Sequence, residues 1–273
     1  MTESSNPKRY EPPAIDLEHK NDSHTAIIEL TGINKRVLEV GTSTGYTSKI
    51  LKNRGNRIIG IEMDEEAGEI AKQYCESMIV GDIEELNLDD YIGPSSIDVI
   101  VLGDILEHLR RPDIILKKMK RYLTPNGYLV VSLPNICHGD ILLNLLNGSF
   151  CYTSVGLLDE THIHFFARKN ISNIFSTSGY NIYDLRKMIT PIGATEQKID
   201  LRRIPLILQK FIKSLPDSNV YQFVFKAVPS NNPVNEAVSN VDFNKLFIIS
   251  IREYLKERVR RVFRRKSAKH RNS

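Results

Sequence analysis

Four carboxylate residues stand at or beside the ends of four successive apolar runs in the first half of the chain. In open α/β sheets the ligand lies outside the carboxyl ends of the strands. A carboxylate at such a place can accept hydrogen bonds from hydroxyl or amine groups of a ligand. The alternative for each acid is a helix N-cap, but four in succession favour a ligand site. The acids are Glu39, Glu62, Asp82 and Asp104.

The turn that follows the first apolar run excludes two common classes of ligand-binding turn. Residues 39–45 read acid-x-Gly-x-Ser-x-Gly. A phosphate-binding P-loop needs Lys directly after its last glycine, where Tyr46 stands. A dinucleotide-binding turn needs glycine at the positions of Ser43 and Tyr46. Gly41 and Gly45 would let a ligand approach the backbone closely; the alternative is an ordinary strand–helix turn.

Apolar runs and helical patterns alternate along most of the chain. The runs are continuously apolar, which is typical of parallel strands buried on both faces. We therefore predict an α/β, doubly wound, parallel sheet. A helix begins after the cap residues 21–23, and residues 124–127 form a turn. Strands are predicted at residues 37–40, 57–62, 77–80, 97–102, 128–133, 181–189 and 220–228, with helices near 25–30, after 45, through 74, and at 111–122, 169–179 and 201–215.

Composition indicates a globular protein of one or two domains. Of the 273 residues, 41% are apolar and 26% charged. No run reaches the roughly 18 apolar residues of a membrane helix, and the polar N-terminus does not resemble a secretory signal. The three widely spaced cysteines predict neither a disulfide framework nor a zinc site, and no metal site is predicted. We expect a protein of the reducing cytoplasm.

Charge is unevenly distributed. The net charge is +4, but residues 252–273 alone carry +8. Residues 241–263 place apolar side chains at helical spacing with Arg and Lys between them. This basic C-terminal helix could lie on an anionic membrane surface, dock on the protein, or contact nucleic acid, which is the least favoured. The predicted organisation is a domain at 1–228, a linker at 229–240 and a basic tail at 241–273.

Several motifs together resemble a known family. Gly-Asp-Ile-Leu-Glu-His-Leu at 103–109, Leu-Thr-Pro-Asn-Gly at 123–127 and Ser-Leu-Pro-Asn at 132–135 resemble methyltransferases that use S-adenosylmethionine (SAM) and are related to ubiquinone-type O-methyltransferases. Residues 39–45 resemble the first motif of class I SAM methyltransferases. Residues 148–166 resemble a narrower group, found with glycosyltransferases in surface-polysaccharide gene sets. The resemblance implies a Rossmann-like fold of seven strands, mostly parallel, with the last strand antiparallel.

The resemblance also implies roles for the acids. SAM carries an ammonium and a sulfonium, which suits Glu39 beside the turn of Gly41, Ser43 and Gly45. We expect Glu62 to accept the ribose hydroxyls, Asp82 to accept the adenine amine while Ile83 packs on the ring, and Asp104 to lie beside the methyl donor.

The candidate general base is His162, which Asp159 would orient; the alternative is that His162 only holds its loop. His138 is the second catalytic candidate. The expected reaction is O-methylation of a sugar or glycan intermediate, free or lipid-linked. A membrane-bound acceptor would place the protein at the inner membrane face. The alternatives are methylation of a quinone-like or small phenolic acceptor, and a SAM-binding scaffold without catalysis. Nucleic acid is a disfavoured acceptor because residues 103–106 lack the Asn/Asp-Pro-Pro-aromatic motif of amino-methylating DNA enzymes.

Overall fold

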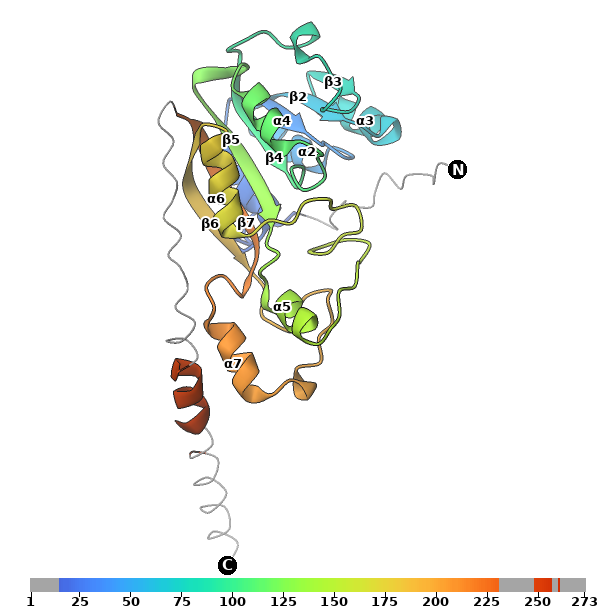
Figure 1. The fold of residues 1–273 in the computed structure, drawn as a ribbon. Coiled ribbons are helices and arrows are strands. Elements are labelled where there is room, and N and C mark those ends of the chain that lie inside the picture. The colour runs from blue at the N-terminus through green and yellow to red at the C-terminus, as the bar shows by residue number, and fades with distance from the viewer. Residues whose placement is uncertain (1–14, 231–247, 257–259, 261–273) are drawn as a thin grey trace, which may run out of the picture. The chain divides into compact units, whose positions relative to one another are not determined.

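The computed structural model describes residues 15–230, 248–256 and 260. Its strands are β1 (Arg36–Val40), β2 (Arg57–Glu62), β3 (Ser77–Val80), β4 (Ile97–Gly103), β5 (Leu123–Pro134), β6 (Tyr180–Ile189) and β7 (Val220–Pro229). They form one seven-stranded sheet in the order β3-β2-β1-β4-β5-β7-β6 (Figure 1). Strands β1 to β5 pair in parallel, and β7 runs antiparallel to β5. The predicted doubly wound sheet with an antiparallel last strand is confirmed.

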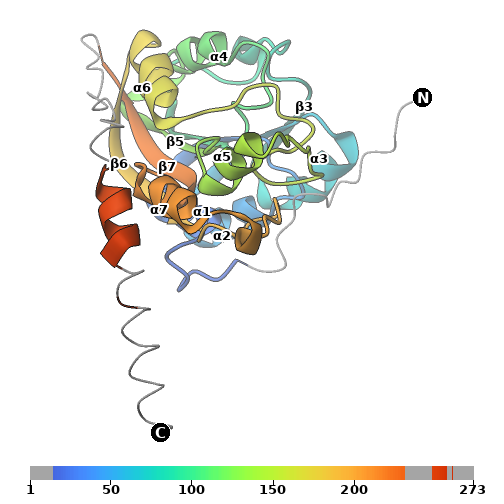
Figure 2. The same cartoon turned by 60° about the horizontal axis from the view of Figure 1, so that its bottom comes forward.

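Helices cover both faces of this sheet. The α-helices are α1 (Ser23–Thr31), α2 (Tyr46–Asn53), α3 (Glu65–Ala71), α4 (Pro112–Met119), α5 (Gly139–Leu146), α6 (Arg168–Thr177) and α7 (Leu206–Ser214), and the short 3-10 helices are η1 (Lys72–Tyr74), η2 (Leu88–Asp90) and η3 (Leu201–Arg203). Helices α4 and α6 lie on one face, whereas α1 and α2 lie on the other (Figures 1 and 2). Among the described residues, none of the helices has the length and apolar character needed to cross a bilayer.

Local sequence explains where the first elements begin. The Asp22 side chain accepts a hydrogen bond from the Thr25 backbone N–H at 2.8 Å, which caps α1 as predicted. Strand β1 is buried over its last four residues rather than on alternate residues, as a strand covered on both faces should be.

The chain divides into two compact units. Of the described residues, the first contains 15–136, 152–189 and 221–230, and therefore nearly the whole sheet. Its core includes Ile28, Val37, Val99 and Val224. The second contains the described residues 137–151, 190–220, 248–256 and 260, and it has its own small core around Leu143, Ile192 and Ile212.

Two features differ from the sequence-based expectation. Residues 124–127, predicted as a turn, lie within the bounds of β5, where the register with β4 shifts because this stretch bulges out of the ladder. Helix α5 was not predicted. Its N-cap is His138, which is not one of the usual capping residues.

The C-terminal tail is only partly described. Residues 248–256 are helical, within the predicted 241–263. Most of the predicted linker and the remaining tail positions, apart from 260, lie outside the described residues.

Candidate active site

The turn after β1 needs glycine at two positions. Gly41, Ser43 and Gly45 all have positive φ, at 75°, 47° and 80°. A Cβ on Gly41 would lie 2.1 Å from Ile105 Cδ1, and a Cβ on Gly45 would lie 2.9 Å from the backbone Cα of Ala71. Glycine is therefore needed at both positions because the backbone is left-handed and because Ile105 and Ala71 occupy the space that a side chain would take.

Replacing Gly45 by Ala tests how strongly this turn depends on glycine. The left-handed conformation alone costs an L-residue about 1–2 kcal/mol, and the contact with Ala71 adds to that because a backbone atom cannot move aside. We expect Gly45→Ala to lower the urea midpoint of unfolding more than Gly148→Ala does. Gly148 has a similar φ of 73°, but a Cβ there would meet nothing within 4 Å. Equal losses would contradict the packing argument.

Glu39 lies beneath the turn rather than on the surface. Its side chain is almost fully buried, and its Oε2 accepts a hydrogen bond from Ser48 Oγ at 2.5 Å. Burial raises the pKa of Glu39 to about 7, which the Ser48 bond partly offsets. A ligand cation beside this carboxyl would favour its ionised form.

Glu62 is the last residue of β2, and its carboxylate contacts both the turn after β1 and the turn after β2. Its Oε2 accepts the Ser43 backbone N–H at 2.7 Å, and its Oε1 accepts the N–H groups of Met63 at 2.9 Å and Asp64 at 3.0 Å. The capping of α3 belongs to Asp64, whose side chain accepts the Ala67 N–H at 2.9 Å. Glu62 is therefore not the N-cap of this helix. A carboxylate has about four lone-pair sites, and these three hydrogen bonds leave one of them for a ligand hydroxyl.

Asp82 and Ile83 follow β3. The Asp82 carboxylate accepts the Glu84 backbone N–H at 2.9 Å, and its other oxygen lies 3.6 Å from Arg110 Nη2. The Asp82 side chain is 30% exposed and can still meet a ligand amine. Ile83 is buried, with 5% of its surface exposed, so packing on an adenine ring would use only an edge of the side chain.

Asp104 follows β4 in a left-handed conformation, with a φ of 54°. Its Oδ1 accepts hydrogen bonds from Ser132 Oγ at 3.0 Å and from Gln222 Nε2. Burial raises the pKa of Asp104, and the positive charge of His24 acts in the opposite direction. The carboxyl is thus held in one orientation by neighbouring strands.

His24 lies on α1, before the first strand, and it is close to the acids of the candidate site. Burial lowers its pKa, but Asp22, Asp104 and Glu39 outweigh burial, so the pKa is raised. Its ring centroid lies 5.3 Å from that of Tyr46. Asp104 and Glu39 are therefore close enough to this imidazole to act on its charge.

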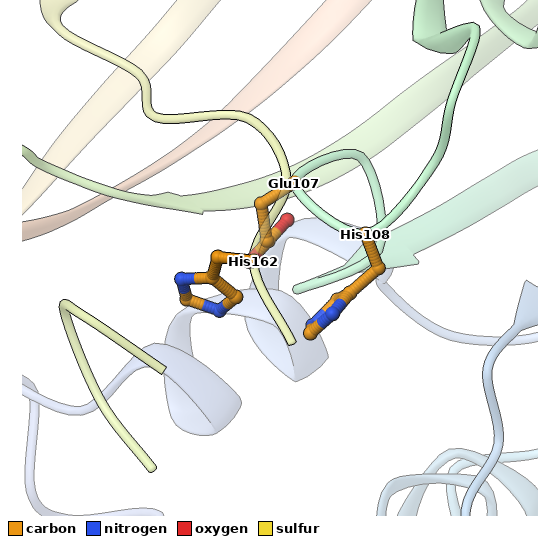
Figure 3. A group of neighbouring side chains, drawn as sticks. All are labelled: Glu107, His108 and His162. Atoms are coloured by element: carbon orange, nitrogen blue, oxygen red, sulfur yellow. The ribbon is translucent and has the colours of Figure 1, made fainter. Parts of the chain in front are cut away.

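The predicted base His162 lies in the loop before α6, next to Glu107 and His108 of the motif at residues 103–109. The rings of His162 and His108 have centroids 4.8 Å apart, and Glu107 lies against both (Figure 3). The Glu107 backbone carbonyl accepts the N–H groups of Ile163 and His164, each at 3.0 Å, which holds this loop against the segment after β4.

Asp159 was predicted to orient His162. Its Oδ1 accepts Thr161 N–H at 2.8 Å and Thr161 Oγ1 at 2.7 Å, and its backbone carbonyl accepts the His162 N–H at 3.0 Å. Asp159 therefore shapes the loop that carries His162, and its direct action on the imidazole stays a prediction.

His138 lies in the second unit. The residue is fully buried, its Nδ1 accepts the Asp140 N–H at 3.2 Å, and its Nε2 lies 2.9 Å from the Thr190 carbonyl oxygen. Both ring nitrogens are thus used in capping α5 and in holding the 190–220 segment. A catalytic role for His138 stays a prediction that this geometry does not favour.

The sheet and its strand-end acids define the class: a Rossmann-like, class I, SAM-dependent methyltransferase domain. The chain belongs to the family described as a methyltransferase domain, which matches residues 18–185. The turn and the acids fit SAM, the cofactor of this class.

Relatives of low sequence identity are also methyltransferases. The ubiquinone biosynthesis O-methyltransferase of Actinobacillus pleuropneumoniae serotype 7 is 30% identical over 108 residues, which are 37% of this chain and 46% of the relative. That of Coxiella burnetii RSA 331 is 23% identical over 163 residues, 58% of this chain and 68% of the relative. The chain thus spans about half the length of the first relatives it matches.

A solved structure shows the same fold. The SAM-dependent methyltransferase of Thermotoga maritima, described as a possible histamine N-methyltransferase, has a TM-score of 0.53 at 16% identity and covers 78% of this chain and 91% of its own. At this identity the similarity concerns the fold alone.

Proposed function

We propose that this chain transfers the methyl group of SAM to a hydroxyl oxygen of a sugar or glycan intermediate. The observation that supports this most directly is the position of His162, with 9% of its surface exposed, on the loop fixed to the segment after Asp104. This loop belongs to residues 148–166, the segment whose sequence resembles methyltransferases of polysaccharide gene sets.

In this proposal the strand-end acids bind the cofactor, and His162 accepts the proton. Bound SAM supplies the methyl group, whose bond to sulfur breaks as its bond to the acceptor oxygen forms. Glu62 and Asp82 bind the ribose and adenine ends, and Asp104 positions the reacting end. His162 takes the proton of the acceptor hydroxyl, and the products are a methyl ether, S-adenosylhomocysteine (SAH) and a protonated imidazole. Such a base contributes about 10²–10⁴-fold in rate.

A second acceptor class is a quinol-like or small phenol. The name of the Actinobacillus relative favours it, because that protein is an O-methyltransferase of ubiquinone biosynthesis. A phenol ionises more readily than a sugar hydroxyl, so it depends less on a general base.

An acceptor screen with tritiated SAM tests the proposal. Nucleotide sugars, lipid-linked glycans and catechols are offered separately, and the methylated product is identified by mass spectrometry. Transfer to a sugar hydroxyl supports the proposal, and transfer to catechols alone supports the second class. SAH binding without transfer to any acceptor would favour the scaffold alternative.

We also propose that the basic tail binds an anionic membrane at its inner face. In the described helix at 248–256, Ile248 and Leu255 are each 50% exposed, and Arg252 and Lys256 are exposed. Each Lys or Arg near such a surface is worth about 1 kcal/mol. We expect the full chain to sediment with phosphatidylglycerol vesicles at low salt, and a version ending at Asn240 to remain in solution. Equal sedimentation of the two would contradict the proposal.

A further inference from the structure

His24 is a half-buried imidazole near the start of α1. Its side chain is 22% exposed, so its proton can exchange with solvent. Asp22, the N-cap of the helix, lies beside it, with Oδ2 3.9 Å from His24 Nδ1. The ring of Tyr46, the first residue of α2, packs against the imidazole edge to face at a centroid distance of 5.3 Å. His24 therefore contacts both the segment before α1 and the turn after β1.

The same helix packs against the end of β4. A Cβ on Gly103, the last residue of β4, would lie 3.2 Å from Ile27 Cδ1. Residues three positions apart in a helix lie on the same side, so His24 is on the side of α1 that carries Ile27. Asp104 directly follows Gly103. The packing of α1 on β4 therefore brings His24 near the acid that is assigned to the reacting end of SAM.

Three carboxylates favour the positive charge of His24. Burial lowers the pKa of His24, but Asp22, Asp104 and Glu39 outweigh burial and raise it. The interaction is mutual, because burial raises the pKa of Asp104 and of Glu39 while the charge of His24 lowers both. The charge of His108 also acts on Asp104. His24 thus supplies positive charge to two acids that the cofactor is expected to meet.

Other charged or titratable groups near α1 have partners away from His24. They are Lys20 and Arg186, which pair with Glu29; Lys49 and Lys52 of α2, which contact η1; and Tyr128 of β5, which donates to carbonyl oxygens at the last turn of α1. The charge of His24 is therefore governed by the carboxylates of the candidate site and by Asp22.

We propose that His24 sets the preference of the site between SAM and SAH, because its imidazolium competes with the sulfonium of SAM for the charge of Asp104. This inference rests on the proposed function, which places the reacting end of SAM beside Asp104. SAM and SAH share an ammonium and a carboxylate, so these groups cancel when the two ligands are compared. SAM alone carries the sulfonium, and like charges beside one carboxylate disfavour each other. His24 should therefore lose its proton when SAM binds and keep it when SAH binds.

The preference for SAM over SAH should rise with pH. Below the pKa of His24 the sulfonium meets an imidazolium, and above that pKa it meets a neutral ring. The affinity for SAM therefore gains on the affinity for SAH as pH rises through the raised pKa of His24. Burial raises the pKa of Glu39 to about 7, so Glu39 titrates nearby. Its effect through the ammonium is common to both ligands and cancels in the ratio of their affinities.

The test is calorimetric titration of the full chain with SAM and with SAH, at about pH 6 and about pH 9, on either side of the range in which such a histidine titrates. We expect the SAM-to-SAH affinity ratio of the parent chain to be about tenfold higher at the higher pH, the effect of a one-unit change in the pKa of His24. His24→Asn carries no charge, so its ratio should be nearly the same at both pH values. His19→Asn is the matched control, since it removes an exposed histidine before α1, and its ratio should follow that of the parent chain.

A second measurement uses the parent chain and does not depend on the folding of a variant. Titrations near neutral pH in two buffers of different ionisation enthalpy count the protons released on binding. The parent chain should release more protons with SAM than with SAH, and this difference should disappear in His24→Asn. A merely structural role of His24 would weaken both ligands alike in the variant and leave the ratio and the proton count unchanged.

Two results would overturn the proposal. One is a SAM-to-SAH ratio of the parent chain that does not change with pH, with equal proton release for the two ligands. The other is a His24→Asn variant that keeps the pH dependence of the parent chain. Neither measurement needs an acceptor, so failure of this proposal is distinguishable from failure of the proposed methyl transfer.

Discussion

His162→Ala is expected to lower the rate of methyl transfer by about 100- to 10,000-fold, the range that a general base contributes. The affinity for SAH should change by no more than a few-fold, because the cofactor contacts are predicted at the ends of β1 to β4. The rate is measured in a single turnover with the acceptor found in the screen, and SAH affinity by calorimetry.

His164→Ala is the control, since it removes an imidazole two residues away that is not assigned to the site. Unchanged turnover in His162→Ala would refute a catalytic role for this residue.

Glu62→Ala should weaken SAH binding by about tenfold to a hundredfold. A hydrogen bond to a charged group is worth about 1.5–3 kcal/mol, and 1.4 kcal/mol is a factor of ten. The substitution removes the acceptor predicted for the ribose and also releases the Ser43 N–H that shapes the first turn. Calorimetric titration with SAH measures the change, and NAD serves as the ligand that should not bind.

Two further variants show whether a loss of SAH affinity in Glu62→Ala comes from the carboxylate of Glu62 itself. Glu62→Gln keeps one carbonyl oxygen as an acceptor and should show an intermediate loss. Glu66→Ala removes an exposed carboxylate from the first turn of α3 and should bind SAH within twofold of the parent chain. If Glu62→Ala leaves SAH affinity unaltered, the residue only supports the turn.

Much of the fold could be predicted because its strands are short, apolar and separated by clear turns. Strands at 57–62 and 77–80 have the predicted bounds, and the antiparallel β7 agrees with the family resemblance. Helix α5 was not predicted from the sequence because its N-cap is His138, which accepts the Asp140 N–H with a ring nitrogen. Histidine is not among the residues that usually cap helices. Propensity rules describe local chemistry, and this cap depends on burial in the folded unit.

The candidate site was predicted only in part for a similar reason. The acids at strand ends follow directly from the order of strands, so Glu39, Glu62, Asp82 and Asp104 could be placed at one edge. The grouping of Glu107 and His108 with His162 depends on a loop that returns to the segment after β4 from more than fifty residues along the chain. Spacing in the sequence carries no signal for such a contact.

The strand order has a consequence for the folding of the chain during synthesis. Strand β7 lies between β5 and β6, although it is the last of the three to leave the ribosome. Until residue 229 has emerged, the edge of β5 has no native neighbour, and β6 has no native place in the sheet. An unpaired edge of this kind is a template for wrong pairing and aggregation. Chains that stop before β7 should therefore be the ones that chaperones retain.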